Sequence, residues 1–146
     1  MKSQLNNSGL QVIGIVGKTS DIMIQFRKIY TIFWSNRLFM FVKVATTDQV
    51  KPGRGFGTKL DKVFIGIYCI DGEYYAIDDV CPHMGGSLHH GFMNDCVVSC
   101  PLHMWEFDVK TGESVWPGSL NIPAYPVKIE GDDILVDIDS PQVQDI

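Results

Sequence analysis

The stretches Cys81-Pro82-His83 and Cys100-Pro101-Leu102-His103 decide how this chain is interpreted, because each places a thiol and an imidazole one or two residues apart. Thiolate sulfur is a soft, anionic ligand and imidazole is a neutral one. Two of each therefore fit either zinc or an iron–sulfur cluster whose two irons have different ligands. The sequence predicts a mixed-ligand metal site formed by Cys81, His83, Cys100 and His103.

The order of the four ligands distinguishes these two alternatives. Zinc sites commonly group Cys with Cys and His with His, so that each short turn binds the ion from one side. Here each stretch supplies one Cys and one His. Where one iron of a [2Fe–2S] cluster takes two Cys and the other takes two His, two such loops hold the cluster from both sides. The order favours this cluster over a zinc-stabilised interaction module.

The complete motif resembles that of the Rieske ferredoxins. It runs Cys81-Pro82-His83-Met84-Gly85-Gly86, then Cys-Pro-Leu-His-Met-Trp-Glu-Phe-Asp from Cys100 to Asp108, and then Thr111-Gly112. The resemblance covers roughly residues 40–138 and implies one Rieske-type [2Fe–2S] cluster. It also implies that Cys81 and Cys100 hold an inner iron. His83 and His103 would hold the outer iron, which is the one reduced.

The resemblance further predicts a low reduction potential. Rieske subunits of respiratory cytochrome complexes add a Cys to each cluster loop, and these two pair as a disulfide; Gly86 and Leu102 occupy those positions here. High-potential members also carry a Ser and a Tyr that donate to cluster and cysteine sulfur, where this chain has Trp105 and Phe107. Fewer donors make reduction harder, so we expect a midpoint toward the roughly −150 mV end of the Rieske range.

Three further expectations concern the loops. The residue after the last ligand is commonly Gly in the family and is Met104 here, so its side chain is expected to strain the loop or shield the cluster. The backbone N–H groups of Gly85, Gly86 and Met104 are expected to donate to sulfur. Trp116-Pro117-Gly118 falls where family members place a proline-containing loop over the cluster.

From Phe41 onward, short β-branched and aromatic runs alternate with Gly-containing turns, which predicts an all-β domain. Asp71-Gly72 predicts a hairpin with a type I′ turn between Val63–Ile70 and Glu73–Ile77. Glu130-Gly131-Asp132 predicts a second hairpin. The resemblance implies the Rieske fold, with antiparallel β-sheets and a two-loop cluster-binding subdomain at one tip. The other expected strands are Phe41–Ala45, Val97–Ser99, Trp105–Asp108, and the arms of the second hairpin, Tyr125–Ile129 and Ile134–Ile138.

A chain of 146 residues, 45% of them hydrophobic, supports one domain. We expect a Rieske [2Fe–2S] domain over residues 40–146 and an amino-terminal extension of unknown role over residues 1–39. The extension is expected to be disordered, to form a short helix over Ile22–Phe33, or to be an artefact of the gene model, with Met40 as the true start. No run of about 18 uncharged apolar residues predicts a membrane span, and no secretory signal is recognised.

From residue 40 onward the chain carries 7 basic and 16 acidic side chains. This acidity argues against nucleic acid and anionic membranes as partners. It is explained equally by steering toward a basic reductase or oxygenase and by ordinary solubility. Cys69 is expected in the core and Cys96 on a strand, and free thiols beside this motif indicate a reducing compartment, the cytoplasm.

The resemblance implies a one-electron carrier between a flavin-dependent reductase and a terminal ring-hydroxylating oxygenase. The alternative is the small subunit of an assimilatory NAD(P)H nitrite reductase, whose acceptor is the reductase large subunit. Members of that group often lack some cluster ligands, whereas this chain keeps all four. No catalytic residue is expected, because only His89 and His90 remain for a 2-His-1-carboxylate iron site. Those two are interpreted as loop residues, with partner contact as the alternative.

Overall fold

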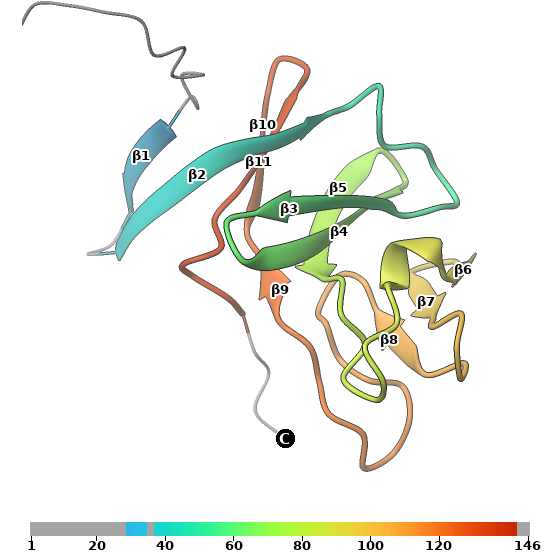
Figure 1. The fold of residues 1–146 in the computed structure, drawn as a ribbon. Helices are drawn as coiled ribbons and strands as arrows, with labels where there is room; N and C mark the ends of the chain where they lie inside the picture. Colours follow the sequence, from blue (N-terminus) through green and yellow to red (C-terminus); the bar gives the residue numbers. More distant parts are fainter. Residues whose placement is uncertain (1–28, 35–36, 143–146) are drawn as a thin grey trace, which may run out of the picture.

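The structure, a computed structural model, describes residues 29–34 and 37–142, which form three antiparallel sheets (Figure 1). The first sheet has the order β1-β2-β11-β10, with strands Ile29–Trp34, Arg37–Thr46, Asp133–Val136 and Val127–Glu130. The second has the order β3-β4-β5-β9, with strands Phe56–Leu60, Val63–Ile70, Glu73–Asp78 and Ala124–Tyr125. The third has the order β6-β7-β8, with strands Phe92–Asn94, Val97–Ser99 and Glu106–Asp108. The all-β prediction is confirmed.

Both predicted hairpins are present. Asp71 and Gly72 have φ angles of 52° and 84°, the two left-handed residues that a type I′ turn requires. Strands β4 and β5 pair across this turn from Ile70↔Glu73 to Ile65↔Asp78. The second hairpin pairs β10 with β11 around Gly131, which has a φ of 59°. Its strands are shorter than predicted.

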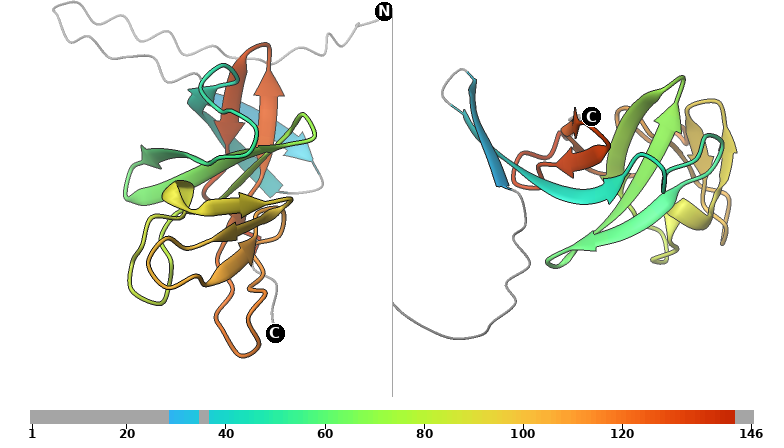
Figure 2. Two further views of the ribbon diagram at one scale, coloured as in Figure 1. Left: turned by 90° about the vertical axis from the view of Figure 1, so that its right-hand side faces the viewer. Right: turned by 90° about the horizontal axis from the view of Figure 1, so that it is seen from above.

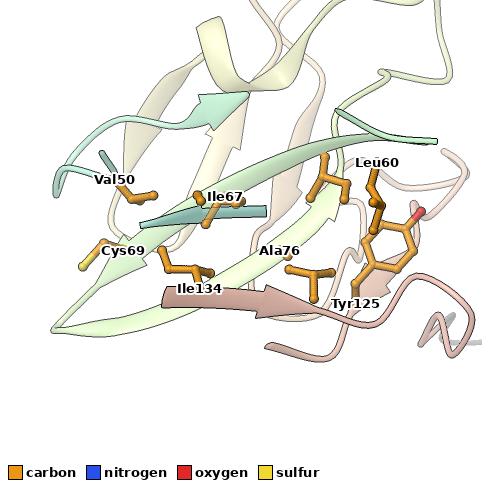
Figure 3. Packing of buried hydrophobic residues seen from close by; sticks show 10 residues of the cluster. Val50, Leu60, Ile67, Cys69, Ala76, Tyr125 and Ile134 are labelled. Carbon is orange, nitrogen blue, oxygen red and sulfur yellow. The ribbon is translucent and has the colours of Figure 1, made fainter. Parts of the chain in front are cut away.

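The middle sheet is buried on both faces. On one face, Ile65, Ile67 and Cys69 of β4 pack with Ile134 of β11 and other residues of the first sheet (Figure 3). Tyr68, between them in the sequence, belongs to a second buried cluster with residues of the third sheet. Cys69 is 6% exposed, which confirms its predicted core position. Burial on both faces explains why β4 reads as an almost unbroken apolar run.

The second cluster fixes the part of the molecule that carries the motif. It joins the middle sheet to the β6-β7-β8 sheet, which stands beside the main body in both views of Figure 2. Each fully buried large apolar side chain contributes about 1.5–3 kcal/mol relative to exposure. The members of this second cluster include Ile77, Leu88, Val98, Phe107, Val109 and Ile122, together with Cys81 and Cys100. The two cysteines of the motif are therefore part of a packed core.

The amino-terminal part differs from the prediction. The helix expected over Ile22–Phe33 is wrong where it can be checked, because Ile29–Trp34 forms β1 and pairs with β2. This segment is β-branched and aromatic, which favours a strand once a partner is available. Strand β2 also begins at Arg37 and so crosses the expected boundary at residue 40. Residues 1–28 lie outside the described part of the chain.

Strand β3 was not predicted from the sequence. Its residues Phe-Gly-Thr-Lys-Leu alternate poorly, and Gly57 weakens the strand signal. Pairing with β4 from Phe56↔Ile67 to Leu60↔Val63 determines its conformation instead. Within residues 29–34 and 37–142, no helix has the length and apolarity needed to cross a membrane.

Candidate metal centre

The two ligand stretches form the same turn twice. In the first loop, Cys81 N–H donates to Gly86 O at 2.9 Å and Gly85 N–H donates to Cys81 O at 2.8 Å. In the second loop, Cys100 N–H donates to Trp105 O at 2.7 Å and Met104 N–H donates to Cys100 O at 3.0 Å. Each loop is therefore closed by its own backbone. Gly85 and Met104 occupy equivalent places in the two turns.

This equivalence explains the unusual Met104. Gly85 has a φ of 72° and Met104 a φ of 60°, so both turns need one residue in the left-handed region. Glycine enters this region without steric cost, whereas a side chain costs about 1–2 kcal/mol there. The expectation of a strained loop at Met104 is met by this backbone geometry. The Met104 side chain is 48% exposed.

The four motif side chains differ in exposure according to residue type. Cys81 and Cys100 are each 1% exposed and interact with one another. The rings of His83 and His103 are exposed, with centroids 4.5 Å apart and planes at 80°. The site therefore has a buried sulfur pair and an outward-facing nitrogen pair. Among the described residues, no three or more His, Cys, Asp or Glu side chains gather as around one metal ion.

This pairing fits a [2Fe–2S] cluster with different ligands on its two irons. Such a cluster needs two thiolates on one side and two imidazoles on the other, and the loops supply both. Burial raises the pKa of the Cys81 thiol above its ordinary value, and the neighbouring Cys100 raises it further. A bound cation favours the thiolate and offsets that penalty.

The backbone donors at sulfur differ in part from those expected. The N–H groups of Gly85 and Met104 are used by the carbonyls that close the two loops, so the prediction is wrong for these two residues, whereas for Gly86 it stays a prediction. The N–H groups of His83 and Met84 lie at the Cys81 sulfur instead, where they lower the pKa of that thiol. A turn that closes on its own carbonyl leaves the earlier N–H groups free to face the sulfur.

Gly86 and Leu102 lie side by side. A Cβ atom built on Gly86 would lie 3.0 Å from Leu102 Cδ1 and 2.9 Å from Cys100 Sγ. The loops thus touch at the two positions where respiratory relatives are expected to carry a disulfide. In this chain the link between the loops at that point is an apolar contact.

The two positions that carry hydroxyl groups in high-potential relatives hold aromatic side chains packed on the site. The Trp105 ring stacks on the His83 ring with centroids 4.6 Å apart and planes at 12°. Phe107 is fully buried in the same cluster as Cys81 and Cys100. Trp105 therefore fixes the orientation of one imidazole, and neither ring offers sulfur an O–H donor.

Three loop segments, two of them the ligand loops, are uncharged and carry exposed apolar side chains. The residues in positions 82–87, 101–105 and 115–120 include no Asp, Glu, Lys or Arg. Their large exposed apolar side chains, which we call the tip residues, are Met84, Leu102, Met104, Val115, Trp116 and Leu120. The covering role of Trp116-Pro117-Gly118 stays a prediction.

A polar pair beside the first loop was not predicted from the sequence. Asp79 is 3% exposed, and its carboxylate accepts hydrogen bonds from both the backbone and the ring of His89. His89 and His90 belong to a 3₁₀ helix, Leu88–His90, rather than to an irregular loop. The available signal was an Asp directly before a ligand loop and a His directly after it. The expectation that Cys96 lies on a strand is wrong: it lies in the turn before β7, where its thiol donates to Asp108 at 3.6 Å.

Comparisons with known proteins agree with this geometry. A family model described as "Rieske [2Fe-2S] domain" matches residues 40–126. The chain is 38% identical over 99 residues to the biphenyl dioxygenase ferredoxin subunit of Pseudomonas sp. (strain KKS102), covering 66% of this chain and 91% of that protein. The solved ferredoxin of carbazole 1,9a-dioxygenase from Nocardioides aromaticivorans IC177 is 35% identical, with a TM-score of 0.63 and coverage of 66% and 96%.

A protein described as an NADH-dependent nitrite reductase small subunit from Mycobacterium tuberculosis is also similar in structure. Its TM-score is 0.62 at 23% identity, with coverage of 68% of this chain and 96% of that one. At this identity the likeness shows the fold alone.

Proposed function

Because the chain belongs to the Rieske [2Fe–2S] domain family, we propose that it carries single electrons from a flavin-dependent reductase to the terminal oxygenase of a ring-hydroxylating system. The [2Fe–2S] cluster supplies the chemistry by accepting and releasing one electron. Two relatives that are 38% and 35% identical to the chain are ferredoxin components of dioxygenase systems. The protein itself holds the cluster and presents it to partners, so no residue is assigned a catalytic role.

We propose that Cys81 and Cys100 bind one iron and that His83 and His103 bind the other. The support is the segregation of a buried sulfur pair from an exposed imidazole pair, which is the single observation that carries the proposal. Trp105 stacks on the His83 ring, and each backbone-closed turn carries one Cys and one His of the proposed ligand set. Neutral imidazoles at the surface give an electron a short path to a docked protein.

The tip residues are the proposed docking surface. Three of them lie in the loops that carry His83 and His103, and all are uncharged, exposed apolar side chains, which are suited to a dry contact core. An apolar contact lets the two proteins approach closely without leaving a buried charge unpaired. We expect the oxygenase to present an apolar surface of matching shape around its own electron-entry site.

The nitrite reductase alternative has weaker support. Solved structures described as small subunits of that enzyme share the fold at 20–23% identity. The more similar relatives are dioxygenase ferredoxins. Our proposal therefore places the oxygenase first and the nitrite reductase large subunit second as acceptor.

We propose the cytoplasm as the compartment and a flavin-dependent reductase as the donor. Cys69 and Cys96, the two cysteines that are not proposed ligands, form no disulfide, and free thiols suit a reducing compartment. We further propose that residues 40–146 are the Rieske domain and that residues 1–39 are an extension. The intact mass of the native protein tests whether translation starts at Met40. Detection of residues 2–35 would contradict that start.

A spectroscopic and kinetic experiment tests the function. Protein prepared anaerobically should contain two irons and two sulfides per chain, absorb visible light and give a Rieske-type EPR signal when reduced. The matched variants are His103→Ala, which removes a proposed ligand, and His90→Ala, which removes an exposed imidazole from the same subdomain. We expect the first to lose the signal and the second to keep it. A wild-type protein that binds only zinc would overturn the proposal.

A second arm identifies the acceptor. Reduced protein is mixed with a ring-hydroxylating terminal oxygenase or with a sirohaem-containing nitrite reductase large subunit, and reoxidation is followed at visible wavelengths. Fast reoxidation by the oxygenase supports the proposal. Reoxidation by the reductase subunit alone would establish the alternative.

A further inference from the structure

The first cluster loop is fastened to the fold at its base by Asp79 and His89. The Asp79 carboxylate accepts one hydrogen bond from His89 N–H at 2.7 Å and another from His89 Nδ1 at 2.6 Å. The Asp79 carbonyl accepts a third from Leu88 N–H at 2.8 Å. A bridge between Val80 and Ser87 lies just inside these contacts. Residues on either side of the loop are therefore joined before the chain enters it and after it leaves.

The His89 ring also packs against β3 of the middle sheet. A Cβ atom on Gly57 of β3 would lie 2.4 Å from His89 Nδ1, and one on Gly55 would lie 2.6 Å from His89 Cα. Real Cβ atoms do not approach other atoms this closely, so the ring occupies space that only glycine leaves open. Two glycines in or beside β3 thus allow His89 to lie between the strand and Asp79.

This arrangement is specific to His89. Its side chain is 22% exposed, and the Asp79 side chain that grips it is 4% exposed. His90 is next in the sequence and its ring centroid lies 3.8 Å from that of His89, but it is exposed. Burying a carboxylate is costly unless it is hydrogen-bonded, and the two bonds from His89 satisfy that need.

The position of the pair relates it to the ligands. Asp79 is two residues before Cys81, and His89 follows the loop that carries Cys81 and His83. At the opposite side of the loop, Gly86 meets Leu102 through an apolar contact only. The directional bonds at the base of the loop join its two sides, and Asp79 N–H also donates to Phe64 O of β4 at 3.0 Å.

We propose that Asp79 and His89 form a clasp that positions the first loop, making His89 a positioning residue for the cluster. The inference rests on the proposed function, since it assumes that the loop binds the cluster. By joining the two sides of the loop where His89 packs against Gly57 of β3, the clasp keeps Cys81 and His83 in register with Cys100 and His103. The clasp thereby affects how long the protein retains the cluster and the midpoint potential at which the cluster is reduced.

Three variants test the clasp. His89→Ala removes the Nδ1 bond, and His89→Asn restores a side-chain N–H at a similar distance from the backbone. His90→Ala is the matched control, because it removes the neighbouring imidazole that has no bond to Asp79. Each purified holoprotein is challenged with an iron chelator, and the loss of visible absorbance is timed. The midpoint potential and the EPR spectrum are recorded in parallel, and far-UV circular dichroism checks the fold.

We expect His89→Ala to lose its cluster about tenfold faster than wild type, as the loss of one charge-assisted hydrogen bond predicts. Its potential and EPR spectrum should shift as well. His89→Asn should recover most of the lifetime and His90→Ala all of it. A purely structural role would leave the potential and EPR spectrum of the loaded protein unchanged, and that result would overturn the proposal.

A second perturbation guards against a variant that fails to fold. Gly57→Ala changes neither Asp79 nor His89, but its added Cβ atom would push the His89 ring away from β3. We therefore expect this variant to shorten cluster retention as well. Equal lifetimes for wild type, His89→Ala and Gly57→Ala would disprove the clasp. If wild-type protein itself holds no iron and sulfide, the proposed function fails instead, so the two failures are distinguishable.

Discussion

At the scale of single residues, the two ligand loops share one type of turn but carry different amino acids at its left-handed position. Gly85 and Met104 are in the same left-handed place in their loops, and only Gly85 is free of steric cost. The strain at Met104 is local, because its N–H still donates to Cys100 O at 3.0 Å. The fold therefore tolerates a side chain beside the last ligand at the expense of stability.

Replacing Met104 by Gly should stabilise the protein. Relief of the left-handed strain exceeds the entropy that Gly adds to the unfolded chain, so we expect a gain of about 1 kcal/mol in the free energy of unfolding. Denaturant titration of the holoprotein measures it. Gly85→Ala is the converse control. A Cβ there meets nothing within 4 Å, so left-handed strain alone acts, and we expect a loss of about 1 kcal/mol. A destabilised Met104→Gly would contradict this account.

Restoring the missing hydroxyl groups should raise the reduction potential. Trp105→Ser and Phe107→Tyr put O–H groups at the positions where high-potential relatives donate to sulfur. Each donor stabilises the reduced, more negative state, so we expect a rise of about 60 mV per hydroxyl in a potentiometric titration. Trp105→Phe keeps the ring on His83 and should leave the potential nearly unchanged. A wild-type midpoint above about +100 mV would refute the low-potential assignment.

At the scale of elements, one glycine joins the third sheet to the segment that leads into β9. Gly112 has a φ of 77°, and its N–H donates to Asp108 O at 2.8 Å. Its carbonyl accepts from Ile122 N–H at 2.9 Å. A Cβ on Gly112 would lie 2.0 Å from Ile122 O, so backbone meets backbone there.

Gly112→Ala should therefore be severely destabilising. Left-handed strain adds to a backbone clash, and we expect a loss of about 3 kcal/mol or more in the free energy of unfolding. Gly118→Ala is the control: Gly118 has a φ of 75°, but a Cβ there meets nothing within 4 Å. It should lose only about 1 kcal/mol. Similar losses for both variants in thermal unfolding would show that the clash relaxes easily.

The elements that could be predicted from the sequence are those with a local signal. Asp71-Gly72 specifies its turn, and β4 carries its apolar run whatever surrounds it. Strand β3 has no such signal, because its conformation comes from pairing with β4. The site divides in the same way. The four expected ligands follow from residue type and spacing, whereas the Asp79–His89 pair depends on the space that Gly57 leaves for the His89 ring in the folded protein.

At the scale of the whole molecule, charge and contact surface are separated. Residues 40–146 carry a strong excess of acidic side chains, but the tip residues and their loops have none. Under the proposed function, long-range attraction and short-range docking would therefore use different parts of the protein. Steering affects the rate of encounter, whereas the apolar contact affects how long the complex lasts.

Ionic strength should separate the two effects. In stopped-flow mixing with the oxygenase, we expect the association rate constant to fall by about tenfold or more from low to high salt, if the partner is basic. The dissociation rate constant should change little. Leu102→Ala should do the reverse, raising dissociation without altering the salt dependence. An association rate that is independent of salt would leave solubility as the meaning of the acidic surface.

The backbone closure of both ligand turns bears on how the protein matures. Each turn is held by amide-to-carbonyl bonds within the chain, so the polypeptide itself contributes to the shape of the turn. A variant that lacks a ligand side chain keeps these backbone groups, so it should lose the cluster without losing the turn. Such variants would show whether the machinery that delivers iron and sulfide recognises the turns or the ligand side chains.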